Sequence, residues 1–525
     1  MKPLGTFLRA SILFICLVCN GEAEEGLSPK KPNVVVFLVD DLGWNHLSSP
    51  GATMGTGKSF FQTPNIDRLA ASGVSFSYCY AQPNCAPSRA VLITGQYPAR
   101  IHNQVFNVGS LNRFKDASSK MEAKFIGANQ SNHIALEAVT IAKALQKNGY
   151  CTAHIGKFHV GKPEESGFDI NIGGLEQGHQ PACFANKTDK GEWEFKGLGR
   201  GDFNRYAAPY EKRYLAQRGL PTSLEGTPKH ICDATGDALV ETIGNLSTSD
   251  KPFYLQFHPY AVHAPVAARL DLKSEALSRL SNGQKKLADY AGFIAGVDEN
   301  VGRLLAALED PNGDGDSSDS IAGNTIVIFT SDNGGTHFSN APLRGEKGEF
   351  LEGGVRVPFI VSGSSRVARG KVCERMLHFV DVYPTILELV GADSTPDAEK
   401  HPLDGVSFAS ALKNPEQALE RETPIYFLFP GYLDTRARPS AGLVAVLDDK
   451  RFKLFYDYES DAWSLYDLDT DQSESQNLIN ELPDIASTLS AKLQSWLTQK
   501  HPTWKPQLPV EKASGQARMV PMIFK

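Results

Sequence analysis

Long apolar runs in the chain predict strands that are buried on both faces of a parallel sheet. The three strongest runs cover residues 33–39, 253–258 and 325–330. From Leu287 to Leu308, apolar residues recur every three or four positions, which predicts an amphipathic helix. Another helix is predicted over 138–146, where Asn148-Gly149 stops it before a strand over 150–155. Because strands alternate with helices, the pattern predicts an α/β fold with a large, mainly parallel sheet flanked by helices.

The pattern changes beyond residue 400. Short runs of alternating apolar and polar residues predict strands over 442–447, 452–456 and 463–466. A late helix follows, with Ile485 and Trp496 at the ends of its apolar face. We therefore expect a catalytic domain over 24–400 and a smaller antiparallel α+β subdomain over 401–525.

The first residues have the pattern of a secretory signal. Lys2 and Arg9 precede an apolar stretch over 10–19, and Gly21-Glu22-Ala23 offers small residues for cleavage after position 23. The stretch is too short to span a bilayer, and no other segment reaches the roughly 18 apolar residues that a transmembrane helix needs. The sequence predicts a protein without a transmembrane segment that is exported to the periplasm or secreted.

Composition narrows the choice of partners. The 525 residues carry 53 basic and 60 acidic side chains, a formal net charge of −7, and the basic residues form no long cluster. Nucleic acid is therefore excluded as the main partner, because phosphate contacts need clustered Lys and Arg. Six cysteines remain beyond the signal, with no zinc-type spacing. Export permits disulfides, and we expect the pair Cys183–Cys232 because both residues lie in the most irregular part of the chain.

Acidic residues follow two of the predicted strands. Asp40 and Asp41 come directly after the first strand, and Asp332 and Asn333 follow the strand over 325–330. Ligand sites of open α/β sheets gather beyond the carboxyl ends of parallel strands, so these four side chains can meet. Three carboxylates and one amide oxygen suit Ca²⁺ or Mg²⁺. The alternative is that each pair only caps a helix or begins a turn.

The segment Cys85-Ala-Pro-Ser-Arg89 adds a reactive side chain. Pro87 and Ser88 favour the start of a helix. Cys85 would then lie at the positive end of that helix, with Arg89 one turn on. A buried structural cysteine is the alternative interpretation of Cys85.

C-x-P-S-R is the sequence that is oxidised to formylglycine, and at this point the chain resembles the type I sulfatases of the alkaline phosphatase superfamily. The resemblance runs from Pro32 to about Leu497. Its motifs, in chain order, are VDDLGW at 39–44, CAPSRAVLITGQYP at 85–98, GKFHVG at 156–161, AVHAPV at 261–266, TSDNGG at 330–335, LRGEKGEFLEGGVRVP at 343–358 and LYDLDTDQSESQNL at 465–478. These motifs in this order imply an alkaline phosphatase-like fold and sulfatase activity.

The resemblance also implies the site residues. One divalent cation, usually Ca²⁺ and less often Mg²⁺, would be held by Asp40, Asp41, Asp332, Asn333 and the modified Cys85. Arg89 and Lys157 would hold the hydrated aldehyde, with His159 beside it, and His263 and Lys347 would face the sulfate. Formylglycine at position 85 also requires a formylglycine-generating enzyme as a partner during maturation.

The mechanism implied by the resemblance has two steps. A hydroxyl of the formylglycine gem-diol attacks sulfur, which gives a covalent sulfo-enzyme, while Lys347 or His263 protonates the leaving oxygen. His159 then takes the proton of the second hydroxyl, and sulfate leaves. An unmodified cysteine cannot perform the second step.

Export favours a polymer as the source of substrate, so we expect a sulfated polysaccharide or a glycosaminoglycan fragment. The long segment over 177–227 is rich in Gly, Pro and aromatic residues. Its large side chains either line a sugar site or pack the segment against the body: Trp193, Phe195, Arg200, Arg205, Tyr206 and Tyr210. A phosphate or phosphonate ester hydrolase on the same scaffold is one alternative, and an inactive carbohydrate-binding homologue is another.

Three further features have weaker patterns. His337, just after the metal pair, is a candidate substrate contact, whereas we expect His258 only to end a strand. The acidic segment over 310–316 imitates the first half of an EF-hand loop, but Ile321 stands where the bidentate Glu belongs. We therefore interpret that segment as a polar turn between a helix and a strand.

Overall fold

The computed structural model describes residues 30–48, 60–107, 116, 118, 121–176, 178, 182–280, 284–433 and 436–524. The predicted signal over 1–23 lies outside these residues. Lys31–Lys525 group into one compact unit. Among the described residues, no helix is both long enough and apolar enough to cross a membrane.

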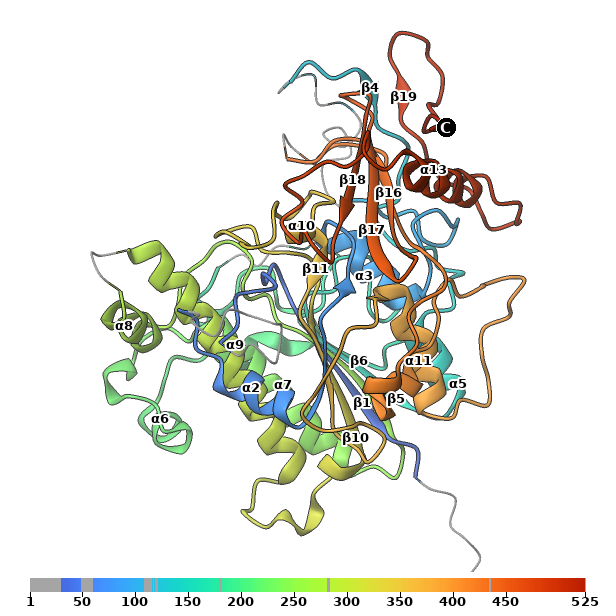
Figure 1. Cartoon of the computed structure of the whole chain (residues 1–525). Helices are drawn as coiled ribbons and strands as arrows, with labels where there is room; N and C mark the ends of the chain where they lie inside the picture. The colour runs from blue at the N-terminus through green and yellow to red at the C-terminus, as the bar shows by residue number, and fades with distance from the viewer. Residues whose placement is uncertain are drawn as a thin grey trace, which may run out of the picture. The chain divides into compact units, whose positions relative to one another are not determined.

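An eight-stranded sheet forms the centre of this unit (Figure 1). Its middle strands are parallel: β1 pairs with β10 and β9, and β5 pairs with β9 and β6. Only β12 runs antiparallel to its neighbours β10 and β2. The sheet is therefore mixed but mainly parallel, as predicted, with strands in the order β13 (Lys371–Cys373), β2 (Gly73–Phe76), β12 (Phe359–Ser362), β10 (Thr325–Ser331), β1 (Asn33–Val39), β9 (Phe253–His258), β5 (Cys151–Gly156) and β6 (Ile170–Ile172).

Alternate side chains of β1 enter two different hydrophobic cores, because successive residues of a strand point to opposite faces. Val35, Phe37 and Val39 pack against α2 (Pro64–Ala71), α7 (Ile231–Ser247) and α9 (Lys285–Glu309). Val34, Val36 and Leu38 belong to the core that contains α3 (Cys85–Thr94), α5 (Ile141–Lys147) and α11 (Val382–Leu389). Figure 1 shows the two helix layers on either side of the sheet. Burial on both faces explains why β1 is a continuous apolar run.

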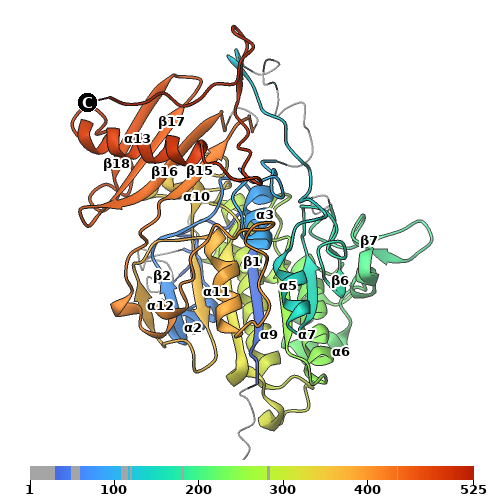
Figure 2. The same ribbon diagram turned by 90° about the vertical axis from the view of Figure 1, so that its right-hand side faces the viewer.

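The C-terminal part is a four-stranded antiparallel meander with one long helix beside it (Figure 2). The predicted strands and helix are present, and α13 packs against β16 and β17. The domain boundary near residue 400 remains a prediction. The elements are β15 (Ile425–Phe429), β16 (Ser440–Leu447), β17 (Lys450–Asp457), β18 (Ala462–Asp467), α13 (Pro483–Leu497) and, before them, α12 (Ala409–Lys413).

Short elements complete the described chain. A three-stranded sheet has the order β11-β3-β14, and two strand pairs, β4 with β19 and β7 with β8, lie outside the main sheets. The acidic segment over 310–316 is a turn between α9 and β10, in which Asp310 accepts the backbone N–H groups of Gly313 and Gly315. The bounds are β3 (Cys79–Tyr80), β11 (Arg356–Val357), β14 (Leu377–His378), β4 (Phe125–Ile126), β19 (Val510–Glu511), β7 (Asn186–Lys187), β8 (Trp193–Glu194), α6 (Lys212–Arg218), α8 (Leu270–Ser278) and α10 (Glu352–Val355).

The segment over 177–227 is more ordered than its sequence suggests, since it contains β7, β8, α6 and a 3₁₀-helix over Arg200–Tyr206. Phe195, Tyr206 and Tyr210 are buried, and Arg205 pairs with Glu241 at 2.6 Å. These side chains pack the segment against the body, which was one of the two sequence-based alternatives.

The predicted disulfide is wrong. Cys183 and Cys232 lie in the same hydrophobic core, but no disulfide joins them. The thiol of Cys183 donates to the carbonyl oxygen of Pro265 at 2.9 Å instead. Irregular sequence indicated that the two cysteines were neighbours, but it carried no information on which atom each thiol faces.

Candidate active site

Three carboxylates meet beyond the carboxyl ends of β1 and β10. Asp40 and Asp41 directly follow β1, and Asp332 and Asn333 directly follow β10, its parallel neighbour. The backbone N–H of Asp41 donates to Oδ1 of Asp332 at 3.2 Å, and Nδ2 of Asn333 donates to Oδ1 of Asp41 at 2.8 Å. Asp41 has a φ of 62°, a left-handed turn that Asp tolerates and that directs the chain away from the strand. The adjacency of two parallel strands thus brings all four side chains together.

Cys85 is the first residue of α3 and faces the carboxylates. Its Sγ and one oxygen each of Asp40 and Asp332 all lie within 4.8 Å of one another. The helix begins at Cys85, two residues before Pro87, because the side chain of Asn84 accepts the N–H of Cys85 at 3.0 Å and caps the helix. Burial raises the pKa of the Cys85 thiol, although Lys157 and Lys347 oppose this. An unmodified thiol here is therefore a poor source of thiolate.

A cation accompanies each carboxylate. Arg89 donates from Nε to Oδ2 of Asp332 at 2.9 Å, and Lys157 lies 2.6 Å from Oδ2 of Asp40. Lys347 lies 2.7 Å from Oδ1 of Asp41. Every one of these side chains is at least nine-tenths buried. The three positive and three negative charges balance, so a divalent cation added at this point would leave an excess positive charge that attracts an anionic substrate.

Burial and neighbouring charges oppose each other at the carboxylates. Burial raises the pKa of Asp41, but Lys347, His263 and Lys157 outweigh it and hold that pKa well below its usual range. At Asp332, burial and the neighbouring Asp40 raise the pKa to about 6 against the effect of Arg89. Burial lowers the pKa of Lys347, but Asp41 outweighs it, so the ammonium stays charged.

His263 and His337 lie near Asp41, and the third candidate histidine follows Lys157 in the chain. His159, two residues after Lys157, is buried and has a φ of 75°. A Cβ on residue 178 would lie 2.3 Å from Nε2 of His159, so glycine is needed there for the chain to pass over the imidazole ring. Nε2 of His263 lies 3.9 Å from Oδ2 of Asp41. Burial and then Lys157 lower the pKa of His263 to about 3. His337 is half-buried, and its ring lies 5.6 Å from that of Tyr290, whose hydroxyl donates to the backbone oxygen of Asp41.

Sequence reasoning missed the support behind Arg89. His258 does end β9, as expected, but its Nδ1 also lies 3.3 Å from NH1 of Arg89. The same guanidinium donates to the carbonyl oxygen of Lys157 at 2.6 Å, and the ring of His154 packs edge-on against that of His258. Histidine at the end of a mainly apolar, buried strand was the available signal, because burial of a polar ring needs a specific partner.

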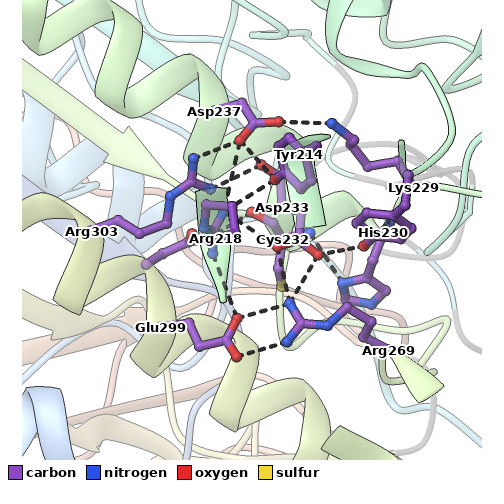
Figure 3. A network of polar contacts seen from close by, with 12 residues as sticks. Tyr214, Arg218, Lys229, His230, Cys232, Asp233, Asp237, Arg269, Glu299 and Arg303 are labelled. Atoms are coloured by element: carbon purple, nitrogen blue, oxygen red, sulfur yellow. Dashed lines mark hydrogen bonds and ion pairs between the residues drawn. The ribbon is translucent and has the colours of Figure 1, made fainter. Parts of the chain in front are cut away.

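The loop that carries His263 is anchored by a buried polar network (Figure 3). Arg269, six residues after His263, is 1% exposed and pairs with Asp233 at 3.0 Å and with Glu299 at 2.7 Å. His230 holds the carbonyl oxygen of Ala267 at 2.9 Å. The network joins α6, α7 and α9 to residues 267–269 and so restrains the C-terminal end of the loop that carries His263.

The donors at this centre fit a hard divalent cation. Oδ1 of Asp40 and Oδ1 of Asn333 are buried and accept no hydrogen bond. Buried oxygens without partners are costly, and a cation that binds oxygen would compensate both of them. Of the residues that the structure describes, only Asp40, Cys85 and Asp332 form a group of three acidic or sulfur side chains close enough to share an ion.

Comparison with known proteins identifies the family. The family model described as Sulfatase matches residues 32–392, and the model described as N-sulphoglucosamine sulphohydrolase, C-terminal, matches residues 346–501. The chain belongs to the sulfatase family. It is a sulfatase, an enzyme that hydrolyses sulfuric esters, and its fold is the alkaline phosphatase-like fold that the resemblance implied.

Three matched relatives cover between 79% and 95% of this chain. A protein named Sulfatase from Formosa agariphila is 38% identical, and the alignment covers 95% of each chain. The N-acetylgalactosamine-6-sulfatase of Sus scrofa is 28% identical over 79% of this chain and 72% of its own. Among solved structures, Ps i-CgsB superimposes on this sulfatase with a TM-score of 0.66 at 27% identity, over 91% of this chain and 94% of its own.

Proposed function

We propose that this sulfatase removes sulfate from sulfated carbohydrate, a polysaccharide or a glycosaminoglycan fragment, with formylglycine at position 85 and one Ca²⁺ as its cofactors. The observation that carries this proposal is that Cys85 lies within 4.8 Å of carboxylate oxygens of Asp40 and Asp332, inside a buried set of three carboxylates and three cations. The C-x-P-S-R sequence at 85–89 supports the modification, and the all-oxygen set of Asp40, Asp41, Asp332 and Asn333 supports Ca²⁺ over a softer metal.

The two cofactors supply a hydrated aldehyde as the nucleophile and a divalent charge next to it. The chain's own residues orient these groups. Arg89 and Lys157 lie against Asp332 and Asp40, beside Cys85, and would hold the oxygens of the modified residue by charge-assisted hydrogen bonds. The amino end of α3 adds a favourable dipole at the same position.

Substrate binding falls to Lys347 and His263. Both lie beside Asp41, and a sulfate ester placed there would face the ammonium of Lys347. Such cations neutralise charge on the sulfuryl oxygens as the ester bond breaks. Asp41 raises the pKa of Lys347, so the ammonium stays protonated beside the substrate, and we assign to it the proton that the leaving oxygen takes up. His159, two residues from Lys157, is the base that would accept the proton released in the second half of the reaction.

Two relatives support a carbohydrate substrate. The relative from Sus scrofa is named for a sulfated sugar, and Ps i-CgsB, at 26–27% identity, has been solved in complex with k-i-k-neocarrahexaose. The apolar stretch over 10–19 favours export of the enzyme. Sulfated polysaccharides occur outside the cytoplasm, so an exported enzyme would meet them.

Side-by-side kinetics test this proposal. Enzyme produced together with a formylglycine-generating enzyme is assayed for sulfate release from 4-nitrophenyl sulfate and from a panel of defined sulfated oligosaccharides. Phosphate and phosphonate analogues are measured in parallel. We expect kcat/KM to favour sulfate esters, with oligosaccharides ahead of the aryl ester. Preference for phosphate would support the alternative hydrolase, and binding without turnover by correctly modified enzyme would support the inactive homologue.

A further inference from the structure

A basic pocket lies between the Lys347 loop and the C-terminal sheet. Its volume is about 420 Å³, and strands β15 to β18 contribute to its wall. Three arginines line it, Arg344, Arg436 and Arg438, together with the ring of Tyr466. None of the candidate active-site residues lines the pocket, although Gly348, the residue after Lys347, does. The pocket is therefore separate from the candidate active site and adjoins it at Gly348.

The pocket shares a wall with the candidate active site. Gly348 has a φ of 100°, and a Cβ there would lie 3.1 Å from the side chain of Leu433 and 3.7 Å from Cβ of Arg436. The chain around Arg436 therefore packs directly on the residue that follows Lys347. Arg436 also donates from NH1 to the hydroxyl of Thr336 at 3.3 Å, three residues after Asn333. A ligand in the pocket would thus lie next to the segments that carry Lys347 and Asn333.

The charges of the pocket favour an anion. Within the described part of the chain, Arg344 and Arg438 make no ion pair, and both are exposed. The guanidinium of Arg344 lies 5.5 Å from the ring centre of Tyr466 and donates to its hydroxyl at 3.1 Å, which holds it in place.

Two carboxylates also line the pocket, and each is already engaged. Glu349 accepts the backbone N–H of Glu346, and Asp457 accepts those of Glu459 and Ser460. Glu349 also interacts electrostatically with Arg344, but among the described residues neither carboxylate forms an ion pair with Arg344 or Arg438, so these two guanidinium groups keep donors for a ligand. Guanidinium groups bind sulfate and carboxylate through paired hydrogen bonds.

We propose that this pocket binds a second anionic group, a sulfate or a carboxylate, on the same carbohydrate whose sulfate ester is hydrolysed beside Lys347. This inference rests on the proposed function and specifies it, because it makes the enzyme selective for carbohydrates that carry at least two negative groups. The pocket begins one residue after Lys347, so the second group would belong to the sugar residue next to the one that is desulfated or to another position on the same residue.

The test uses the full-length, formylglycine-containing enzyme and a matched substrate series. The series is one oligosaccharide with a single sulfate, the same oligosaccharide with a second sulfate, and the same with one sulfate and a carboxylate. The double variant Arg344→Gln/Arg438→Gln is compared with wild type and with Arg213→Gln. Arg213 is also exposed, but it lies on α6, far from the C-terminal sheet in both views (Figures 1 and 2).

We expect wild type to prefer a doubly anionic substrate at least tenfold in kcat/KM, mainly through KM, and the double variant to lose that preference. The arm that shows the preference, second sulfate or carboxylate, identifies the group that is bound. Equal loss on all three substrates, or an unchanged preference in the double variant with its melting temperature preserved, would overturn the inference. An enzyme that releases sulfate from none of the substrates would instead overturn the proposed function and this inference with it.

Discussion

The ammonium of Lys347 lies 2.7 Å from Oδ1 of Asp41, a carboxylate 306 residues earlier in the chain. Asp41 is held by the turn after β1, and Lys347 by a loop whose N–H groups reach Gly335 and Pro83. The pair therefore joins three separate motifs of the sequence at one point. Because both side chains are buried, loss of either would leave an uncompensated charge in a site of low dielectric.

Replacement of this lysine is expected to affect turnover more than binding. Lys347→Met removes a positive charge that we propose faces the sulfate and also the proposed proton donor, so kcat should fall by about 10²–10⁴-fold. Initial rates on 4-nitrophenyl sulfate measure this. The control is Lys450→Met, since Lys450 is an exposed lysine whose Nζ lies 3.5 Å from Asp467. Wild-type kcat in Lys347→Met would contradict the role.

Substitution of Cys85 tests the proposed nucleophile. Cys85→Ser and Cys85→Ala both remove the thiol of the C-x-P-S-R sequence that is oxidised, and we expect both to lose sulfatase turnover while the fold stays intact. Ala is a conservative change in the buried first turn of α3, so far-UV circular dichroism should match that of wild type. Mass analysis of the peptide that contains residue 85 should show formylglycine in wild type only. Normal turnover in either variant would refute the nucleophile.

Removal of the cation should lower both stability and activity. With a chelator present, the buried oxygens of Asp40 and Asn333 lack compensation, so the melting temperature should fall, and Ca²⁺ should restore it more fully than Mg²⁺. A site filled at 100 times its Kd adds about 2.7 kcal/mol to stability. Thermal melts with chelator and with each ion measure the effect. Asp40→Asn should abolish most of the Ca²⁺ response, and an undiminished response would place the ion elsewhere.

The sequence predicted the fold better than it predicted the contacts. Buried strands such as β1 and β9 were located to the residue, because burial on both faces leaves a mainly apolar run. The meeting of Asp40 with Asp332 followed from strand order and from the family motifs. The Cys183 contact and the Arg89–His258 contact could not be predicted, because each depends on side-chain orientations that only the packed loops determine.

The buried network of Arg269 should contribute strongly to stability. Arg269→Gln leaves Asp233 buried without its main cation, and pairs of this kind cost about 3–5 kcal/mol when one partner is removed. Arg205→Gln is the control, since its pair with Glu241 is exposed and should be worth about 1 kcal/mol or less. Urea unfolding at neutral pH measures both. Equal losses in the two variants would show that burial does not set the strength of these pairs.

Acid should destabilise the enzyme partly through His401. Burial lowers the pKa of His401 to about 4, while its Nε2 donates to the carbonyl oxygen of Thr94 at 2.9 Å. A folded-state pKa below the unfolded value of about 6.5 gives stability that is complete above pH 6.5 and is lost as the pH falls towards 4. At pH 5 the loss from this group should be about 2 kcal/mol, because only the unfolded chain takes up the proton there.

His401→Gln keeps a donor for Thr94 but cannot titrate, so its free energy of unfolding should change by about 2 kcal/mol less than that of wild type between pH 7.5 and 5. His133→Gln is the control, because His133 is exposed. Identical pH dependence in His401→Gln and wild type would show that His401 is not protonated on unfolding in this range.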